Sequence, residues 1–212
     1  MLKTMNKKTI SQVNKTFVRK LLKSLAEIGI KKTDIICILL GGSSLYLNNC
    51  KDIDLKVIVK YRNPHVQESR SFDINGYEVD CIYYTLNEWS NIKYRETIYF
   101  VTESPDLVTV YGDDKDFVRH DILKDKELAR RILENYDRSL FHYKNENLLY
   151  GYSEMPSKRI WNFLMFAYKL KNKSHRLTKK QLKEIQQVHD SEVNVGQYEP
   201  LFNEISEILK GE

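Results

Sequence analysis

The stretch IICILLGGSSLYLNNCKDIDLKVIVKY, residues 35–61, decides the fold predicted for this chain. It opens with a continuous apolar run, Ile35 to Leu40, which is typical of a strand buried on both faces. The run ends at Gly41 and Gly42, where the backbone can turn sharply and approach a ligand closely. The first part of the stretch therefore predicts a central strand that stops at a tight turn.

Two serines follow the glycines of this turn. Ser43 and Ser44 stand where a short helix over residues 45–48 would begin, so free backbone N–H groups and hydroxyls would converge at one point beside Gly42. Such a point suits a phosphate group. We therefore interpret Gly42, Ser43 and Ser44 as candidate phosphate-binding residues.

The second half of the stretch carries two aspartates. Asp52 and Asp54 lie two residues apart in DIDLKVIV, which has strong strand character. Because side chains alternate along a strand, both carboxylates share one face while Ile53 and Leu55 point to the other. Two adjacent negative charges repel each other unless a divalent cation such as Mg²⁺ or Mn²⁺ lies between them, and such hard cations prefer carboxylate oxygens.

A third carboxylate is available further along the chain. Asp80 lies in the apolar run VDCIYY, residues 79–84, which follows the turn-like sequence Asp73-Ile74-Asn75-Gly76. If this run pairs beside the Asp52 strand, three carboxylates meet near the glycine-serine turn. An isolated Asp-x-Asp is usually solvated surface and an isolated Gly-Gly is usually only a turn, so the ordered combination is what indicates a site.

This order of motifs resembles the nucleotidyltransferase superfamily typified by DNA polymerase beta. The matching residues are Leu40, Gly42 and Ser43, then Asp52-Ile53-Asp54-Leu55, then Val79-Asp80-Cys81. Eight residues separate Ser43 from Asp52, toward the short end of the family's spacing. The resemblance covers residues 35–84 and extends only loosely beyond them. It implies an α+β fold, in which a mixed sheet with flanking helices forms the nucleotidyltransferase core and an α-helical domain follows.

The resemblance also implies a function for these residues. A nucleoside monophosphate would move from an NTP to a hydroxyl acceptor, with release of pyrophosphate. Asp52 and Asp54 would hold two Mg²⁺ ions, for which Mn²⁺ could substitute, and Asp80 would complete the acceptor-side metal site and help take the hydroxyl proton. Gly42 and Ser43 would hold the phosphates. The acceptor stays open among an RNA end, a protein and a small molecule, and so does the oligomeric state.

Composition limits the class of protein. The chain has 212 residues, of which 42% are hydrophobic and 30% charged, as expected for a globular protein of one domain or two small ones. No apolar run is long enough to span a membrane, and the basic, polar start of the chain does not read as a secretory signal. Three scattered cysteines fit a reducing compartment. We therefore expect a cytoplasmic protein without a membrane partner.

The periodicity of the sequence changes at about residue 124. Before it, an apolar stripe between residues 11 and 28, ended by Gly29, predicts a helix that packs on the sheet. After it, helical spacing predicts helices over residues 128–140, 160–170 and 199–210. We therefore expect a catalytic domain over residues 1–123 and a helical C-terminal domain over residues 124–212.

A basic segment runs through the predicted helical domain. Nine lysines and arginines lie between Lys158 and Lys183, and the first acidic residue after them is Glu184. The resemblance implies that a lysine of this domain reaches the NTP phosphates, for which Lys158 and Lys169 are candidates, and Tyr168 could stack on the base. The segment could instead follow an RNA backbone, or be the solvated, lysine-rich face common on helices.

Two other classes of protein fit the same sequence. A nucleotide- or RNA-binding regulatory or antitoxin-like protein could keep this fold with little turnover, although three crowded carboxylates have no physical use without a metal. An RNA-binding protein that uses the basic helices would act without metal and bind with a steep salt dependence. The net charge of +5 is mild for a dedicated nucleic-acid protein. The chain is also short for a processive polymerase.

Overall fold

The computed structural model describes residues 13–46, 52–90, 102–135, 156–190 and 195–211. The chain divides into two compact units, Met1–Arg95 with Asp106–Arg119, and Glu96–Pro105 with His120–Glu212. The domain boundary expected between residues 123 and 124 stays a prediction.

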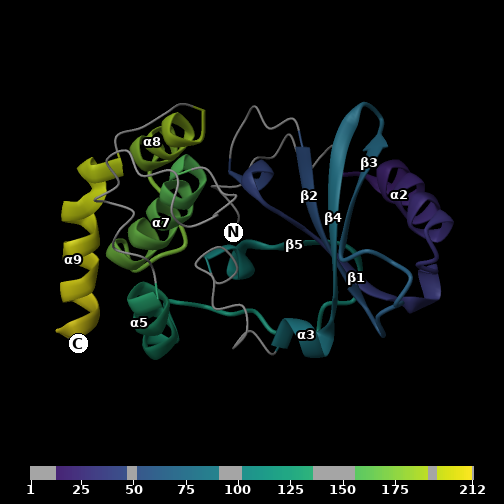
Figure 1. Ribbon diagram of the computed structural model, residues 1–212, viewed down its shortest axis with the longest axis horizontal. Coiled ribbons are helices and arrows are strands. Elements are labelled where there is room, and N and C mark those ends of the chain that lie inside the picture. The colour runs from purple at the N-terminus through teal and green to yellow at the C-terminus, as the bar shows by residue number, and fades with distance from the viewer. Residues whose placement is uncertain (1–12, 47–51, 91–101, 136–155, 191–194, 212) are drawn as a thin grey trace. The chain divides into compact units, whose positions relative to one another are not determined.

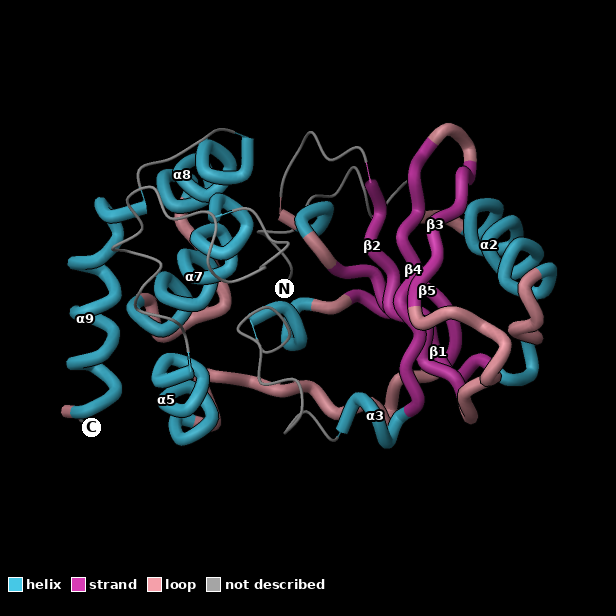
Figure 2. The backbone as a smooth tube through the Cα atoms, in the orientation of Figure 1, coloured by secondary structure: helices cyan, strands magenta, loops and turns pink. Residues whose placement is uncertain are grey.

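A five-stranded mixed sheet forms the centre of the first unit (Figures 1 and 2). The order of the strands is β3-β4-β2-β1-β5. β2 and β4 run parallel, and the other neighbouring strands are antiparallel. The expected α+β class with a mixed sheet is confirmed. The strands are β1 (Ile35–Gly41), β2 (Asp52–Val59), β3 (Ser69–Ile74), β4 (Tyr77–Thr85) and β5 (Val108–Gly112).

The burial of β1 and β2 follows the sequence pattern. β1 lies between β2 and β5, and all its residues except Ile36 are buried. At the start of β2, Ile53 and Leu55 are buried while Asp52 and Asp54 are only half-buried. The predicted alternation is therefore confirmed, and it directs the two carboxylates to the opposite face from the apolar side chains.

A tight hairpin joins β3 and β4. Asn75 and Gly76 have φ angles of 61° and 78°, the left-handed conformation that a two-residue hairpin turn requires. Asp73 Oδ1 accepts a hydrogen bond from Gly76 N at 3.2 Å. The turn was predicted, but β3 was not, because this edge strand is largely exposed and carries little apolar signal.

The helix α2 (Lys15–Glu27) packs on the sheet through one apolar stripe (Figure 1). Asn14 caps its start, since Asn14 Oδ1 accepts from Thr16 N and Phe17 N at 3.0 and 3.1 Å. Phe17, Val18, Leu21 and Leu25 are buried. The helix ends before Gly29, whose φ of 92° suits a helix C-terminus, as predicted.

The short helix α3 (Leu86–Ser90) follows β4 and anchors a tryptophan. The backbone N–H of Thr85 donates to Glu88, and the N–H of Glu88 donates back to Thr85 Oγ1, which forms a capping box. Trp89 is 1% exposed, contacts the Tyr84 ring edge-on at 5.4 Å between centroids, and donates from Nε1 to the Val118 carbonyl. The contact with Tyr84 of β4 packs Trp89 on the sheet.

The second unit is built from helices. Their apolar faces share a core that includes Phe163 and Phe202, whose ring centroids lie 5.8 Å apart. The helix over residues 179–190 was not predicted, because its charged sequence hides a short apolar stripe, and residues 136–140 of another predicted helix lie outside the described residues. No helix in the described part of the chain is both long and apolar enough to cross a membrane. The helices are α5 (Lys126–Asn135), α7 (Pro156–Lys171), α8 (Lys179–Asp190) and α9 (Glu199–Lys210).

Candidate active site

Three carboxylates converge on one face of the sheet. The parallel pairing of β2 and β4 places Asp54 beside Asp80, and Asp52 lies two residues before Asp54 on the same face. One carboxylate oxygen from each residue lies within 4.8 Å of the other two, and all three residues are half-buried. The structure therefore brings together the three aspartates singled out in the sequence.

Gly42 lies directly against one of these carboxylates. A Cβ atom at Gly42 would lie 1.7 Å from Asp54 Oδ2, and the residue has a φ of 72°. Only glycine accommodates both the close approach and this backbone conformation. The turn at Gly42 therefore packs directly against the Asp54 carboxylate. A 3-10 helix at Ser43–Leu45 begins directly after Gly42, and residues 47–48 of the helix expected over residues 45–48 lie outside the described residues.

The hydroxyl of Ser71 orients the third carboxylate. Ser71 on β3 pairs with Asp80 on β4, and Ser71 Oγ donates a short hydrogen bond to Asp80 Oδ1. The sequence analysis missed Ser71 because it did not predict β3. Only the Asn-Gly turn, which sets the hairpin register, could have pointed to this pair.

A buried lysine shares the face of the carboxylates. Lys56 lies two residues after Asp54 on β2, beside Ile82 on β4, and its side chain is 1% exposed. The period-two alternation of the strand could have identified Lys56, but the sequence analysis did not consider it.

The serines of the turn have different environments. Ser43 is half-buried, whereas Ser44 is buried and its Oγ donates to the Gly41 carbonyl at 2.8 Å. The hydroxyl of Ser44 therefore stabilises the turn itself. Its predicted contact with a nucleotide phosphate would have to replace or share this hydrogen bond.

The remaining predicted nucleotide-binding residues belong to the second unit. Lys169 is 0% exposed, and its Nζ donates to the Thr102 carbonyl at 2.7 Å, so Lys169 is not part of an exposed basic face. Tyr168 donates from its hydroxyl to Glu184 Oε2 at 2.7 Å, and burial, together with this carboxylate, raises the Tyr168 pKa. The Lys158 side chain lies outside the described part of the structure.

The acidic turn after β5 has a structural role. Asp114 Oδ2 accepts from Thr109 Oγ1 and from Arg119, each at 2.6 Å. These two hydrogen bonds lower the pKa of Asp114. Asp113 and Asp116 are exposed, and among the residues that the structure describes only the Asp52, Asp54 and Asp80 cluster has the arrangement of a metal site.

The donor set of this cluster fits a hard divalent cation. Three carboxylates supply only oxygen ligands, which Mg²⁺ and Mn²⁺ prefer over softer metals. Their half-buried position leaves the cluster accessible to further oxygen ligands such as water or phosphate. Asp52, Asp54 and Asp80 are therefore the residues that would hold a metal in this unit.

Comparison with known proteins adds distant structural likeness only. No family model matches the chain, and no curated protein matches it. The chain is similar to the crystal structure of a nucleotidyltransferase-like protein from Exiguobacterium sibiricum 255-15, with 12% sequence identity and a TM-score of 0.31. The match covers 92% of this chain and 74% of the other. A likeness this weak says nothing about catalysis, which has to follow from the residues.

Proposed function

We propose that this chain is a metal-dependent nucleotidyltransferase, which transfers a nucleoside monophosphate from an NTP to a hydroxyl acceptor and releases pyrophosphate. The observation that carries this proposal is the convergence of Asp52, Asp54 and Asp80, each with an oxygen within 4.8 Å of the others. The contact between Gly42 and Asp54 supports it further, because it joins the turn assigned to the phosphates to the carboxylates.

Each group of the site has a role in this reaction. Asp52, Asp54 and Asp80 would hold divalent cations, which when bound would neutralise the triphosphate and acidify the acceptor hydroxyl. Asp80, oriented by Ser71, would accept the hydroxyl proton. The acceptor oxygen then forms a bond to the α-phosphorus, and the bond from that phosphorus to the pyrophosphate oxygen breaks.

Nucleotide contacts are proposed at both units. Gly42 and Ser43 would bind the β- and γ-phosphates, since a turn without side-chain bulk lets phosphates approach the backbone. Lys158 and Tyr168 remain proposed contacts to the phosphates and the base. A contact from Lys169 would require its ammonium to leave the Thr102 carbonyl, to which it now donates.

The first experiment is incubation of the purified protein with each α-labelled NTP and Mg²⁺ or Mn²⁺, with and without total RNA and cell extract. Label and pyrophosphate are followed, and the fraction that becomes labelled identifies the acceptor. The double variant Asp52→Asn/Asp54→Asn should abolish transfer, because it removes two of the anionic ligands while preserving side-chain size.

A matched control separates this effect from a general loss of acidic charge. Asp113→Asn/Asp116→Asn removes the same charge from an exposed turn of the same unit and should leave transfer unchanged. If the wild-type protein moves no label with any NTP, or if both double variants transfer equally, the proposal is wrong. Binding of a nucleotide without turnover would instead favour the regulatory protein considered above.

A further inference from the structure

The second unit presents a surface of exposed positive charge that the proposed chemistry does not use. It extends from the last turn of α7, through residues 172–178, to the first turns of α8. No acidic residue occurs anywhere in this part of the sequence. We call it the basic surface, and its members are Lys171, Lys173, Arg176, Lys179, Lys180 and Lys183, all exposed.

Uncharged side chains hold the turn that displays these charges. Asn172 Nδ2 donates to Gln181 Oε1 at 3.0 Å, and Gln181 Nε2 donates back to Asn172 Oδ1 at 3.2 Å. Gln181 Oε1 also accepts from Thr178 N at 2.8 Å, and Thr178 Oγ1 accepts from Gln181 N at 3.2 Å. Amides and a hydroxyl, and no lysine ammonium group, form this network across the turn.

One lysine occupies a backbone position that favours glycine. Lys173 has a φ of 47° at the C-terminus of α7. Its N–H donates to the Leu170 carbonyl and the N–H of Ser174 donates to the Lys169 carbonyl, the pattern that closes a helix with a left-handed residue. Glycine or asparagine adopts this conformation at lower cost, so the positive charge at position 173 is present despite the backbone.

The start of α8 also places positive charges where a helix disfavours them. Lys179 and Lys183 are four residues apart on one face, where like charges repel, and Lys180 lies three residues before Lys183. The first turn of a helix favours negative charge, yet that of α8 has no acidic residue. Local stability therefore does not explain this arrangement, and features of this kind concentrate at functional sites.

Three acidic side chains of this unit have partners other than Lys179, Lys180 and Lys183. Glu184, the first acid after the basic segment, accepts from the Tyr168 hydroxyl at 2.7 Å. Asp121 lies 3.0 Å from His175 Nε2 and 3.3 Å from Lys124 Nζ. Glu204 forms an ion pair with one member of the basic surface, Lys171, at 2.7 Å between Glu204 Oε1 and Lys171 Nζ. Within the part of the chain that the structure describes, Lys179, Lys180 and Lys183 form no ion pair, so their charge is available to an external anion.

We infer that the basic surface binds RNA, and that RNA is the class of acceptor for the transferase proposed above, on which this second step rests. A row of exposed lysines recognises a chain of phosphates without reading its bases. RNA combines such a chain with ribose hydroxyls, the acceptor group that the reaction requires. A neutral small molecule would use none of these charges.

Fluorescence anisotropy with a labelled single-stranded RNA of about 20 nucleotides tests the inference. Binding is measured in EDTA without NTP across a range of KCl concentrations, so the result does not depend on catalysis. The variant Lys179→Gln/Lys180→Gln/Lys183→Gln should make the negative slope of log K against log[salt] shallower by about 2, since each single-strand phosphate contact contributes about −0.7. At about 100 mM KCl, loss of each contact weakens RNA affinity about 5-fold, so loss of all three contacts weakens it about 100-fold.

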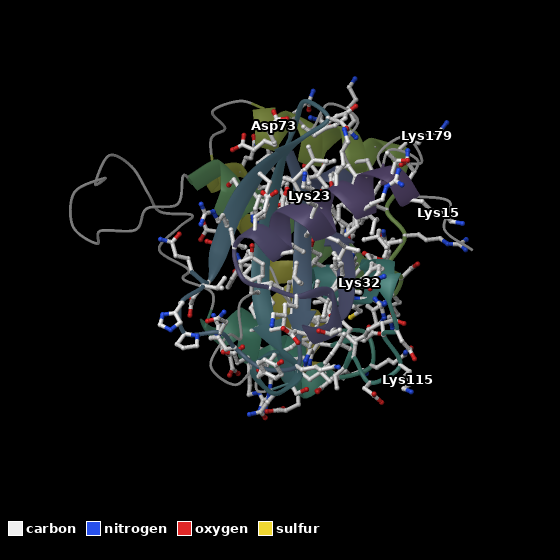
Figure 3. All side chains as sticks on the ribbon, turned by 90° about the vertical axis from the view of Figure 1, so that its right-hand side faces the viewer. Lys15, Lys23, Lys32, Asp73, Lys115 and Lys179 are labelled. Carbon is white, nitrogen blue, oxygen red and sulfur yellow. The ribbon has the colours of Figure 1, made fainter. Side chains whose placement is uncertain are left out.

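The matched control neutralises three exposed basic residues on α2. Lys15 and Lys23 project from the outer side of this helix (Figure 3), and Arg19 lies between them at helical spacing. Lys15→Gln/Arg19→Gln/Lys23→Gln changes net charge equally and should leave the slope as in wild type. Equal losses in both triple variants, no RNA binding by wild type at low salt, or equal displacement of RNA by polyglutamate would each overturn the inference.

Lys173→Gly separates binding from folding. This variant should melt at a higher temperature, because glycine relieves the left-handed backbone, while RNA affinity falls about 5-fold through loss of one phosphate contact. A rise in stability with unchanged RNA affinity would refute the role of Lys173. Asp52→Asn/Asp54→Asn should bind RNA as wild type does, so loss of transfer and loss of RNA binding are distinguished.

Discussion

Replacement of Gly42 by alanine tests whether the turn and the carboxylates form one site. The new Cβ would lie 1.7 Å from Asp54 Oδ2, 2.3 Å from Asp54 Cγ and 2.6 Å from Asp54 Cβ. These distances are too short for atoms that are not bonded to each other, so either the Asp54 side chain or the turn must move. Because the whole carboxylate is too close, a small adjustment of its oxygens is not enough.

Two terms determine the size of the effect. Gly42 has φ 72° and ψ −169°, a conformation essentially restricted to glycine, which costs alanine about 1–3 kcal/mol. Displacement of Asp54 from its rotamer adds about 0.5–1.5 kcal/mol. Gly42→Ala should therefore lower the free energy of unfolding by about 2–4 kcal/mol. It should also weaken Mn²⁺ binding about 10-fold or more, since the position of a ligand is disturbed.

Urea unfolding with and without Mn²⁺ measures both effects. At saturating Mn²⁺, a 10-fold weaker affinity reduces the stabilisation by about 1.4 kcal/mol relative to wild type. Gly76→Ala is the matched control, because Gly76 also has a positive φ, of 78°, but nothing lies within 4 Å of its Cβ position. If Gly42→Ala is no less stable than Gly76→Ala and gains as much from Mn²⁺ as wild type, the turn does not position Asp54.

Three further outcomes are expected. Ser71→Ala removes the hydrogen bond that orients Asp80, so isothermal titration should show weaker Mn²⁺ binding and the transfer rate should fall, with the fold retained. Hydrogen bonds from Thr109 and Arg119 lower the pKa of Asp114, so their stabilisation is complete above the ordinary aspartate pKa of about 3.9 and is lost as pH falls through the folded value. The free energies of unfolding of wild type and Asp114→Asn, measured by urea titration, should therefore be similar at low pH, and wild type should be the more stable above the ordinary aspartate pKa. Removal of divalent cations with EDTA should abolish transfer, and added Mn²⁺ should restore it, whereas activity that persists in EDTA would exclude a metal-dependent reaction.

The parts of the fold that could be predicted depend on local patterns. The apolar run of β1, the alternation of Asp52 and Asp54 with buried neighbours, and the glycine that ends α2 each follow from a periodicity or a backbone preference within a few residues. The sequence alone did not determine whether the strand that carries Asp80 pairs with β2. The parallel register that sets Asp54 beside Asp80 depends on a connection whose strand, β3, carries little apolar signal of its own.

Lys169 shows why the rest of the site could not be predicted. Its sequence position, among the nine lysines and arginines between Lys158 and Lys183, suggested a solvent-facing cation. The side chain is instead fully buried, because the Thr102 carbonyl, 67 residues away in the sequence, accepts from its ammonium. A buried charge is tolerated only where such a partner exists, and no local pattern encodes that partner. Lys56 differs, because the same alternation that placed Asp52 and Asp54 on one face also places Lys56 there. Distance along the sequence between interacting groups, and not the strength of any one motif, therefore separates the residues that could be assigned from those that could not.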